Sequence, residues 1–173
     1  MTPGLPPGLA IEVEPYDGPA GTELVAQMMA DIDERYADVD DPHGRSPELA
    51  ERWAVRPAQM TPPAGVFAVV RDGGRPVACG GVRPLLDGDP GVGEIKRMYT
   101  SPQARRRGIS RALLAWLERE AVALGYRRLH LETGRRQPEA VALYESVGYA
   151  RIAPYGEFAT YPVSLSYGKD LTT

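Results

Sequence analysis

The stretch from residue 93 to residue 120 constrains the fold of this chain more than any other part of it. Residues 93–100 are strand-like, residues 105–111 form a basic turn that contains Gly108, and residues 112–120 are strongly helical. The first N–H groups of a helix have no acceptors within the helix, and the helix dipole adds partial positive charge beside them. Because glycine also lets an anion approach the backbone closely, this order of elements predicts a phosphate-binding turn.

A second motif follows after one more strand-like run. Residues 137–149 read Gln-Pro-Glu-Ala-Val-Ala-Leu-Tyr-Glu-Ser-Val-Gly-Tyr, an Ala-x-x-Leu-Tyr pattern followed closely by Gly and an aromatic residue. The earlier turn has the pattern Arg-x-x-Gly-x-Ser at residues 105–110. In this order and spacing, the two motifs resemble those of the GNAT N-acetyltransferases. The resemblance is specific over residues 94–149 and weaker over most of the chain.

The resemblance implies an α/β fold, the GNAT fold, with a mixed, mostly antiparallel central sheet of about seven strands flanked by about four helices. Hydrophobic periodicity and turn residues predict elements in the matching order, β-α-α-β-β-β-α-β-α-β-β. The predicted helices cover residues 20–37, 46–53, 108–124 and 138–148. The predicted strands cover residues 9–13, 65–70, 75–82, 92–100, 127–133, 149–154 and 163–170.

Length and composition fit one domain. With 173 residues, 43% of them hydrophobic and 25% charged, the chain can bury one substantial core. We predict a flexible tail at residues 1–8, which lack the features of a signal peptide, and a single domain at residues 9–173. No run approaches the ~20 apolar residues that span a bilayer, and the single Cys79 has no disulfide partner in the chain. These features favour a cytoplasmic protein without membrane contact.

Charge is distributed unevenly along the chain. Residues 1–64 carry 12 acidic and 4 basic side chains, whereas residues 101–136 carry 3 acidic and 9 basic ones. The basic block surrounds the predicted phosphate turn and would attract an anionic ligand. A nucleic-acid surface is the alternative, but the block lacks interleaved aromatic residues and the net charge is −3. We therefore expect no nucleic-acid partner.

The resemblance implies that acetyl-CoA binds at the basic turn as a co-substrate. Family members hold the pyrophosphate with Gln or Arg at the position of Arg105 and with the amides that follow, and Ser110 stands where they have Gly or Ala. Their preceding strand pairs with the pantetheine arm and splays away from the next strand. Gln137 stands where many members carry an asparagine. The implied acetyl-CoA-binding residues are Met98, Tyr99, Arg105, Arg106, Arg107, Gly108, Ile109, Ser110, Arg111, Gln137 and Tyr144.

Tyr144 is the candidate general acid. The resemblance places the tyrosine of the Leu-Tyr motif near the sulfur of the cofactor. A phenol with a pKa near ~10 can protonate a departing thiolate. The alternative is an aromatic side chain that packs on the sheet.

Glu94 is the candidate base. It precedes Gly108 by 14 residues, the same offset as the catalytic carboxylate of histone-acetylating family members. A carboxylate needs burial or a water relay to deprotonate an ammonium. The alternative is an exposed strand glutamate that pairs with Lys96 or Arg97. Two further titratable residues are weaker candidates for the base: Glu132 and His130. The two histidines and one cysteine have no metal-ligand spacing.

We predict an N-acetyltransferase that moves an acetyl group from acetyl-CoA to a primary amine of a small cationic molecule by direct attack in a ternary complex. Acidic residues between the first two predicted strands favour a cationic acceptor: Asp31, Asp33, Glu34, Asp38, Asp40, Asp41, Glu48 and Glu51. A solvated face is the alternative reading of those charges. Four aromatic residues are candidates for the acceptor wall: Tyr36, Trp53, Tyr155 and Tyr161.

Two other functions stay open on the sequence alone. One is acetylation of a protein N-terminus or lysine by the same fold, and the other is a non-catalytic acyl-CoA-binding module. The resemblance also allows a homodimer paired through the C-terminal strands.

Overall fold

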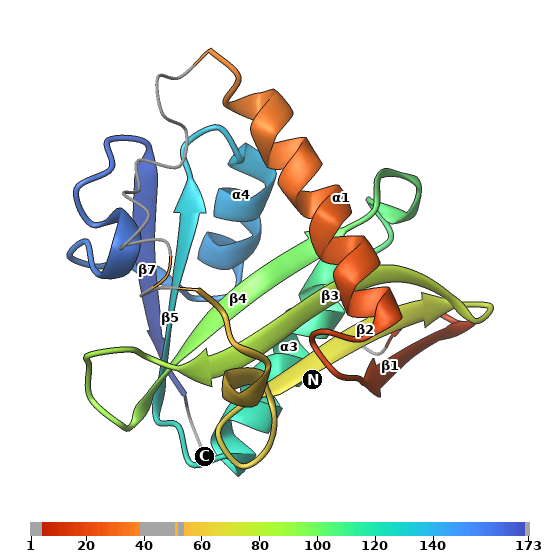
Figure 1. Ribbon diagram of the computed structural model, residues 1–173, viewed down its shortest axis with the longest axis horizontal. Coiled ribbons are helices and arrows are strands. Elements are labelled where there is room, and N and C mark those ends of the chain that lie inside the picture. Colours follow the sequence, from red (N-terminus) through yellow and green to blue (C-terminus); the bar gives the residue numbers. More distant parts are fainter. Residues whose placement is uncertain (1–4, 39–50, 52–53, 172–173) are drawn as a thin grey trace.

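The structure, a computed structural model, describes residues 5–38, 51 and 54–171 (Figure 1). Its strands are β1 (Leu9–Val13), β2 (Val66–Asp72), β3 (Arg75–Pro84), β4 (Val92–Thr100), β5 (Arg128–Gly134), β6 (Ala150–Arg151) and β7 (Ser164–Asp170). Its α-helices are α1 (Pro19–Arg35), α3 (Ile109–Ala123) and α4 (Pro138–Ser146). Three short 3-10 helices cover Pro57–Met60, Pro102–Ala104 and Gly156–Phe158.

All seven strands form one sheet in the order β1-β2-β3-β4-β5-β7-β6. Every neighbouring pair is antiparallel except β4 and β5, which run parallel. The parallel pair is joined through α3, as a crossover between parallel strands requires. The predicted fold class, a mostly antiparallel sheet with flanking helices, is confirmed.

The sheet is buried on both faces because its central strands are apolar on both sides. Along β2, Val66, Ala68 and Val70 belong to the core that includes α3, whereas Phe67 and Val69 belong to the core that includes α1. Alternate residues of a strand point to opposite faces, so a continuous apolar run requires cover on each face. Figure 1 shows α1 on one face of the sheet and α3 on the other.

The helices begin and end where the sequence predicts. Pro138 stands in the first turn of α4, where its missing N–H costs nothing. Gly125 follows α3 with a φ of +92°, and Gly148 follows α4 with a φ of +93°. This left-handed conformation is strained for residues with a Cβ, so both glycines act as the predicted helix stops.

The parallel strands β4 and β5 diverge part of the way along their length. They pair from Val92 with Arg128 to Ile95 with Leu131 and no further. Beyond that point β4 stays paired with β3 and β5 stays paired with β7, so the two strands separate (Figure 1). One edge of the second half of β4 is therefore left without a strand partner among the described residues.

A bulge occurs in β4 where the strands diverge. Between the pairs Cys79–Tyr99 and Gly81–Lys96, β4 has two residues where β3 has one. Arg97 lies in this bulge with a φ of +61°. Bulges of this kind bend a strand and re-aim its side chains.

Three sequence predictions need comment. The predicted helix at residues 46–53 lies outside the described residues, except for Glu51. The predicted strand at residues 149–154 is shorter, since β6 covers only Ala150–Arg151 and Pro154 has no N–H to extend the ladder. Of the predicted tail, residues 5–8 are described, and Leu5 packs against the core.

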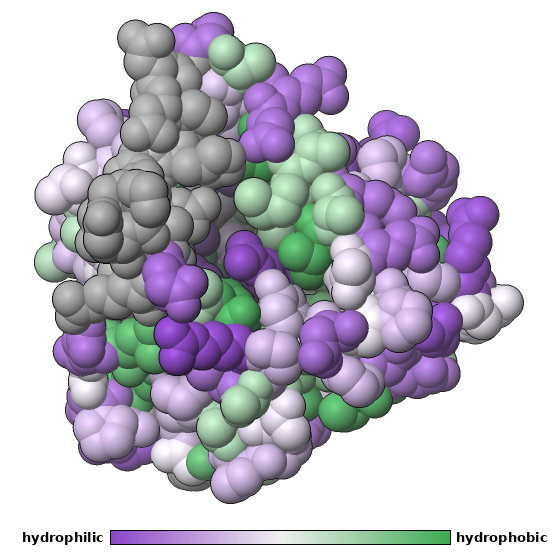
Figure 2. Space-filling view, in the orientation of Figure 1, coloured by the Kyte–Doolittle hydropathy of each residue, from purple (hydrophilic) through white to green (hydrophobic). Residues whose placement is uncertain are grey.

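On the face that Figure 2 shows, most of the coloured surface is hydrophilic. Figure 2 shows hydrophobic residues in small separate areas on one face. Val13, with 57% of its surface exposed, is the one large hydrophobic residue classed as exposed in the described part of the chain. None of the helices that the structure describes is long and apolar enough to cross a membrane.

Candidate active site

The basic turn between β4 and α3 has the backbone of an anion site. Arg106, with a φ of +63°, and Gly108, with a φ of +76°, are both left-handed, as in turns whose N–H groups face one concavity. The helix begins at Ile109 without a side-chain cap, so its first N–H groups have no acceptor within the helix. A Cβ added to Gly108 would meet no atom within 4 Å, so the space beside it is open.

Side chains fix the two ends of this turn. Arg105 donates from Nε to the Thr100 carbonyl at 3.0 Å and forms an ion pair with Asp31 of α1 at 2.5 Å. The Thr100 and Ser110 hydroxyls lie 2.9 Å apart. The hydroxyl of Ser110, where the family has Gly or Ala, therefore ties the start of α3 to the end of β4.

Two other arginines of the turn, Arg111 and Arg107, contact two different elements of the structure. Arg111 donates to the Ser146 hydroxyl of α4 at 2.7 Å, which links the two helices beside the turn. Arg107 forms an ion pair with Asp72 at the end of β2, at 2.6 Å. Arg107 is thus directed toward the β2–β3 hairpin.

A groove of about 530 Å³ lies in front of the turn, between α1, β4 and α4. Of the residues predicted to bind acetyl-CoA, Arg107 does not line this groove. The ten that do are Met98, Tyr99, Arg105, Arg106, Gly108, Ile109, Ser110, Arg111, Gln137 and Tyr144. We call this cavity the turn groove.

A second cavity, of about 200 Å³, occupies the cleft between β4 and β5. We call it the cleft pocket. Its polar lining side chains are Lys96, Arg97, Glu132, Thr133, Gln137 and Ser164, together with the hydroxyls of Tyr36, Tyr144 and Tyr161. Its apolar lining comes mainly from α1 and the segment before β7: Met28, Met29, Ile32, Phe158 and Val163.

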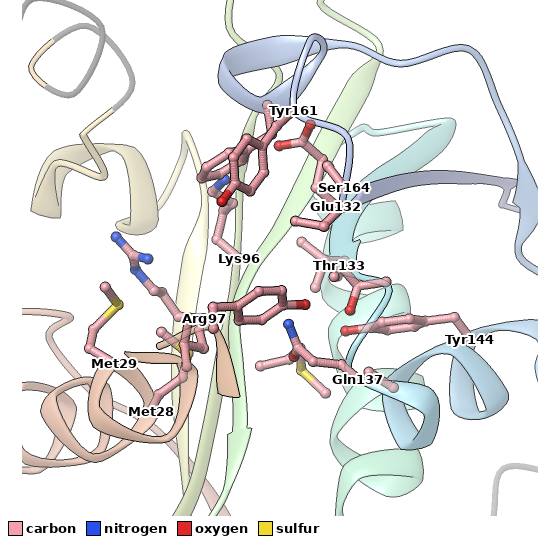
Figure 3. Close-up of a pocket in the computed structure, with 18 residues that line it drawn as sticks. Met28, Met29, Lys96, Arg97, Glu132, Thr133, Gln137, Tyr144, Tyr161 and Ser164 are labelled. Atoms are coloured by element: carbon pink, nitrogen blue, oxygen red, sulfur yellow. The ribbon is translucent and has the colours of Figure 1, made fainter. Parts of the chain in front are cut away.

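The turn groove and the cleft pocket meet. Six residues line both cavities: Met28, Ile32, Met98, Gln137, Ala140 and Tyr144. Figure 3 shows the polar ends of Thr133, Gln137 and Tyr144 directed toward one another at this junction. Two ligands, one in each cavity, would therefore come into contact there.

Tyr144 is buried, with 6% of its surface exposed, and its ring packs edge-on against Tyr149 at 5.7 Å. Burial raises the pKa of the Tyr144 hydroxyl above that of a free phenol, so it stays protonated near neutral pH. Figure 3 shows the hydroxyl pointing into the cleft pocket. The side chain therefore packs against a neighbouring aromatic residue and also directs its hydroxyl toward the junction, while its role as the general acid stays a prediction.

Glu94 lines neither cavity. It is 1% exposed, and its carboxylate pairs with the buried guanidinium of Arg83 at 2.8 Å and with Lys96 at 3.5 Å. The alternative of an exposed strand glutamate is wrong, although the pairing with Lys96 is confirmed. Burial acts to raise the pKa of Glu94, but Lys96, Arg83 and the Tyr155 hydroxyl outweigh it, and the net pKa is lowered.

The Glu94 carboxylate also anchors the segment that closes the cleft pocket. Tyr155 donates its hydroxyl to Glu94 at 3.2 Å. Burial and the neighbouring carboxylate raise the pKa of Tyr155, so the hydroxyl remains a donor. Tyr155 itself does not line the pocket, but the segment that follows it supplies Phe158 and Tyr161 to the pocket wall.

Of the weaker base candidates, Glu132 lines the cleft pocket and His130 does not. The two residues alternate with the buried Leu129 and Leu131 along β5. His130 accepts a hydrogen bond from Arg128, and its ring lies 5.1 Å from the ring of Tyr155 at an interplanar angle of 51°. Burial, together with Arg128, lowers the pKa of His130.

The end of α1 is tied across the cleft. Arg35 donates to the Arg136 carbonyl at 2.9 Å, and Arg136 donates to the Arg35 carbonyl at 3.0 Å. The Tyr36 hydroxyl accepts a hydrogen bond from the Arg136 amide at 3.2 Å, and its ring lines the pocket. A Cβ on Gly134 would lie 1.8 Å from that hydroxyl, so a larger residue there would displace the Tyr36 side chain.

Three acidic residues predicted to attract a cation are described in ion pairs: Asp31 with Arg105, Asp38 with Arg136, and Glu51 with Arg56. Of the predicted aromatic wall, Tyr36 and Tyr161 line the cleft pocket, and Trp53 lies outside the described residues.

Sequence reasoning missed Arg83, the main partner of Glu94. The two residues stand directly opposite each other in the antiparallel β3–β4 pair. Opposite charges at facing positions stabilise a strand pair, so aligning the two predicted strands could have revealed them.

Comparison with known proteins places the chain in a family. The model of the acetyltransferase (GNAT) family matches residues 25–149. An IAA acetyltransferase of Azospirillum brasilense is 42% identical over 105 residues, covering 61% of this chain and 67% of that protein. The uncharacterised N-acetyltransferase YjgM of Escherichia coli is 30% identical over 140 residues, covering 79% of this chain and 78% of that protein.

Solved structures share the fold over almost the whole chain. A Klebsiella pneumoniae protein classed as an acyl-CoA N-acyltransferase superposes with a TM-score of 0.71 and 26% identity, covering 95% of this chain and 98% of that one. A GNAT acetyltransferase of Elizabethkingia anophelis, solved with acetyl-CoA bound, has a TM-score of 0.63 and 17% identity, covering 96% and 100%. The chain belongs to the acetyltransferase (GNAT) family and is an acyltransferase.

Proposed function

We propose that this enzyme transfers the acetyl group of acetyl-CoA to a primary amine of a small molecule at the junction of the turn groove and the cleft pocket. The observation that carries the proposal is that the two cavities share Met98, Gln137 and Tyr144. A thioester that reaches the junction from the groove would meet an amine that reaches it from the pocket. Such a meeting supports direct attack in a ternary complex.

The turn groove would hold acetyl-CoA by its pyrophosphate and its pantetheine arm. The open amides of residues 106–111 suit the pyrophosphate, since they combine free N–H donors with the positive end of α3. The edge of β4 that faces β5 has no strand partner at Met98 and Tyr99 among the described residues. This free edge suits the amide groups of the pantetheine arm. We leave Arg107 out of this assignment because it pairs with Asp72.

The chemistry needs one proton removed and one supplied. The amine nitrogen attacks the thioester carbon, the C–S bond breaks, and the thiolate takes a proton. We assign that proton to the Tyr144 hydroxyl, which stays protonated because burial raises its pKa. The proton lost by the amine passes to a base and then to solvent, and Tyr144 takes a proton back from solvent, so the products are an acetamide and the free thiol.

We assign the base to Glu132 rather than to Glu94. Glu132 lines the cleft pocket on the β5 side, whereas Glu94 lies outside both cavities with its charge balanced by Arg83. Glu132 would also attract an arriving amine in its ammonium form. This carboxylate is the feature of the pocket that favours the cationic acceptor predicted from the sequence. Glu94 then acts as a positioning residue through Tyr155.

The acceptor can be sought with a thiol-release assay. Purified enzyme and acetyl-CoA are mixed with a panel of small amines, amino acids, polyamines, aminoglycosides and peptides, and with IAA, the compound named for one relative. We expect release with one class of small amines and none with peptides. Release with peptides alone would favour a protein acetyltransferase. Binding of acetyl-CoA without release in any mixture would favour a non-catalytic module.

We also propose that the enzyme works in the cytoplasm. Pairing of two copies through the C-terminal strands stays a prediction, which light scattering of the purified protein would test.

A further inference from the structure

Arg97 lies at an unusual place in the cleft pocket. It is half-buried in the β4 bulge, with a left-handed φ of +61°, and it lines the pocket. A left-handed backbone is strained for a residue with a Cβ, and glycine would avoid that strain. Backbone outliers of this kind concentrate at ligand-binding sites, where they aim a side chain.

The Arg97 side chain is held in place but is not neutralised. Its Nε donates to the Tyr16 hydroxyl at 3.2 Å. A guanidinium carries five N–H donors, so this bond leaves the two terminal nitrogens for a ligand. Within residues 5–38 and 54–171 no carboxylate forms an ion pair with Arg97. The buried Arg83 of β3, by contrast, has Glu94 as its counter-ion.

The charges around the cleft pocket favour a ligand with one negative charge. Its described charged lining residues are Lys96, Arg97 and Glu132, two cations and one carboxylate. Lys96 already lies 3.5 Å from Glu94. A guanidinium in a fixed position binds a carboxylate through two parallel hydrogen bonds. One unbalanced guanidinium matches a carboxylate better than it matches a phosphate monoester with about two charges.

We propose that the acceptor is an amino carboxylic acid and that Arg97 binds its carboxylate while its amine faces Tyr144 and Glu132. The inference rests on the proposed function and narrows its substrate class. The α1 wall of the pocket is apolar, from Met28, Met29 and Ile32, which suits an acceptor with an apolar body. Figure 3 shows Arg97 on the β4 side of the pocket and Tyr144 opposite it, on the α4 side.

Matched acceptors test the inference with the wild-type enzyme. One series consists of amino acids and their carboxamides, and a second consists of ω-amino acids of increasing length and the corresponding alkylamines. In both series the amine is kept and the carboxylate is removed. We expect kcat/KM for thiol release to be about 10-fold to 100-fold higher with the carboxylate, since a hydrogen bond to a charged group has that effect.

The variant Arg97→Gln tests the residue. It should lose about 10-fold to 100-fold in kcat/KM for the carboxylate acceptors and stay within about threefold of wild type for the uncharged ones. Arg97→Lys should recover part of the loss, because it keeps the charge without the fork. The matched control is Arg119→Gln, on the exposed side of α3, which should leave both series unchanged. Circular dichroism checks that each variant is folded.

The outcomes separate this inference from the proposed function. Transfer to amines with no preference for the carboxylate would overturn the inference and leave the proposed function standing. Transfer that prefers carboxylates equally in the wild type and in folded Arg97→Gln would overturn the assignment to Arg97. Absence of transfer to every acceptor in both series would overturn the two together. If Arg97→Gln does not fold, the preference of the wild-type enzyme still decides whether the acceptor is a carboxylate.

Discussion

The substitution Glu94→Gln distinguishes a positioning role for this residue from the catalytic role that its place in the sequence suggests. Glutamine keeps the size of the side chain and an acceptor for the Tyr155 hydroxyl, but it removes the charge that balances Arg83. Arg83 is 0% exposed, so its guanidinium would be left without its counter-ion in the interior. Removing one member of a buried ion pair costs about 3–5 kcal/mol. At this chain length, such a loss lowers the melting temperature by roughly 6–20 °C.

Urea denaturation of the wild type and of Glu94→Gln, followed by circular dichroism, measures this loss directly. The matched control is Glu23→Gln on the exposed face of α1, which should change the free energy of unfolding by less than about 0.5 kcal/mol. The folded fraction of Glu94→Gln should retain most of its turnover. KM for the acceptor should stay near the wild-type value, because the glutamine still accepts from Tyr155, which positions the segment that carries Phe158 and Tyr161.

The pH dependence of the free energy of unfolding gives an independent check of the ion pair between Glu94 and Arg83. The pKa of Glu94 is lowered in the folded state from an ordinary value of 4.5, so its contribution to stability is complete above pH 4.5. The contribution is lost as the pH falls through the lower folded pKa, and the gap between wild type and Glu94→Gln should narrow there. A variant as stable as the wild type would refute the reasoning about the ion pair. A stable variant with kcat reduced a hundredfold or more would instead show that Glu94, and not Glu132, acts as the base.

Three further predictions concern other parts of the site. Gly108→Ala should weaken acetyl-CoA binding more than tenfold in calorimetry, whereas Gly125→Ala, with the same left-handed strain at the other end of α3, should leave it unchanged; equal affinities would remove the turn from the site. Tyr144→Phe should lower kcat about 100-fold with the acetyl-CoA affinity kept, and an unchanged kcat would exclude Tyr144 as the acid. Burial raises the pKa of Cys79 to about 12, so a thiol reagent at pH 8 should label it only after unfolding, and rapid labelling of the folded protein would contradict its burial.

The fold could be predicted from the sequence because its signals are local. The apolar run of β2, the Asp72-Gly73-Gly74 turn and the glycines after α3 and α4 each determine the structure of their own neighbourhood. The divergence of β4 from β5 could not be read in the same way. It depends on how far two strands separated by α3 stay in register, and that is settled by packing across the whole sheet.

In the candidate site, too, some features follow from local motifs and others depend on the folded sheet. The turn at Gly108 and the direction of Tyr144 follow from motifs within single segments, and both lie at the groove that the structure contains. The environment of Glu94 depends on Arg83, which the hairpin brings opposite it, and on Tyr155, which is 61 residues away in the chain. Arg97 lines the pocket because of the bulge in β4, and no residue pattern in the sequence predicts that bulge. These are properties of the folded sheet and not of a segment.

A crystal structure of the enzyme with acetyl-CoA tests the central claim most directly, namely that the turn groove leads the thioester to the junction at Tyr144. We predict that the pyrophosphate lies on the amides of residues 106–111 and that the sulfur lies within hydrogen-bonding distance of the Tyr144 hydroxyl, with the acetyl group facing the cleft pocket. A bound cofactor whose thioester lies away from Tyr144, or whose acetyl group is shut off from the pocket, would contradict the account.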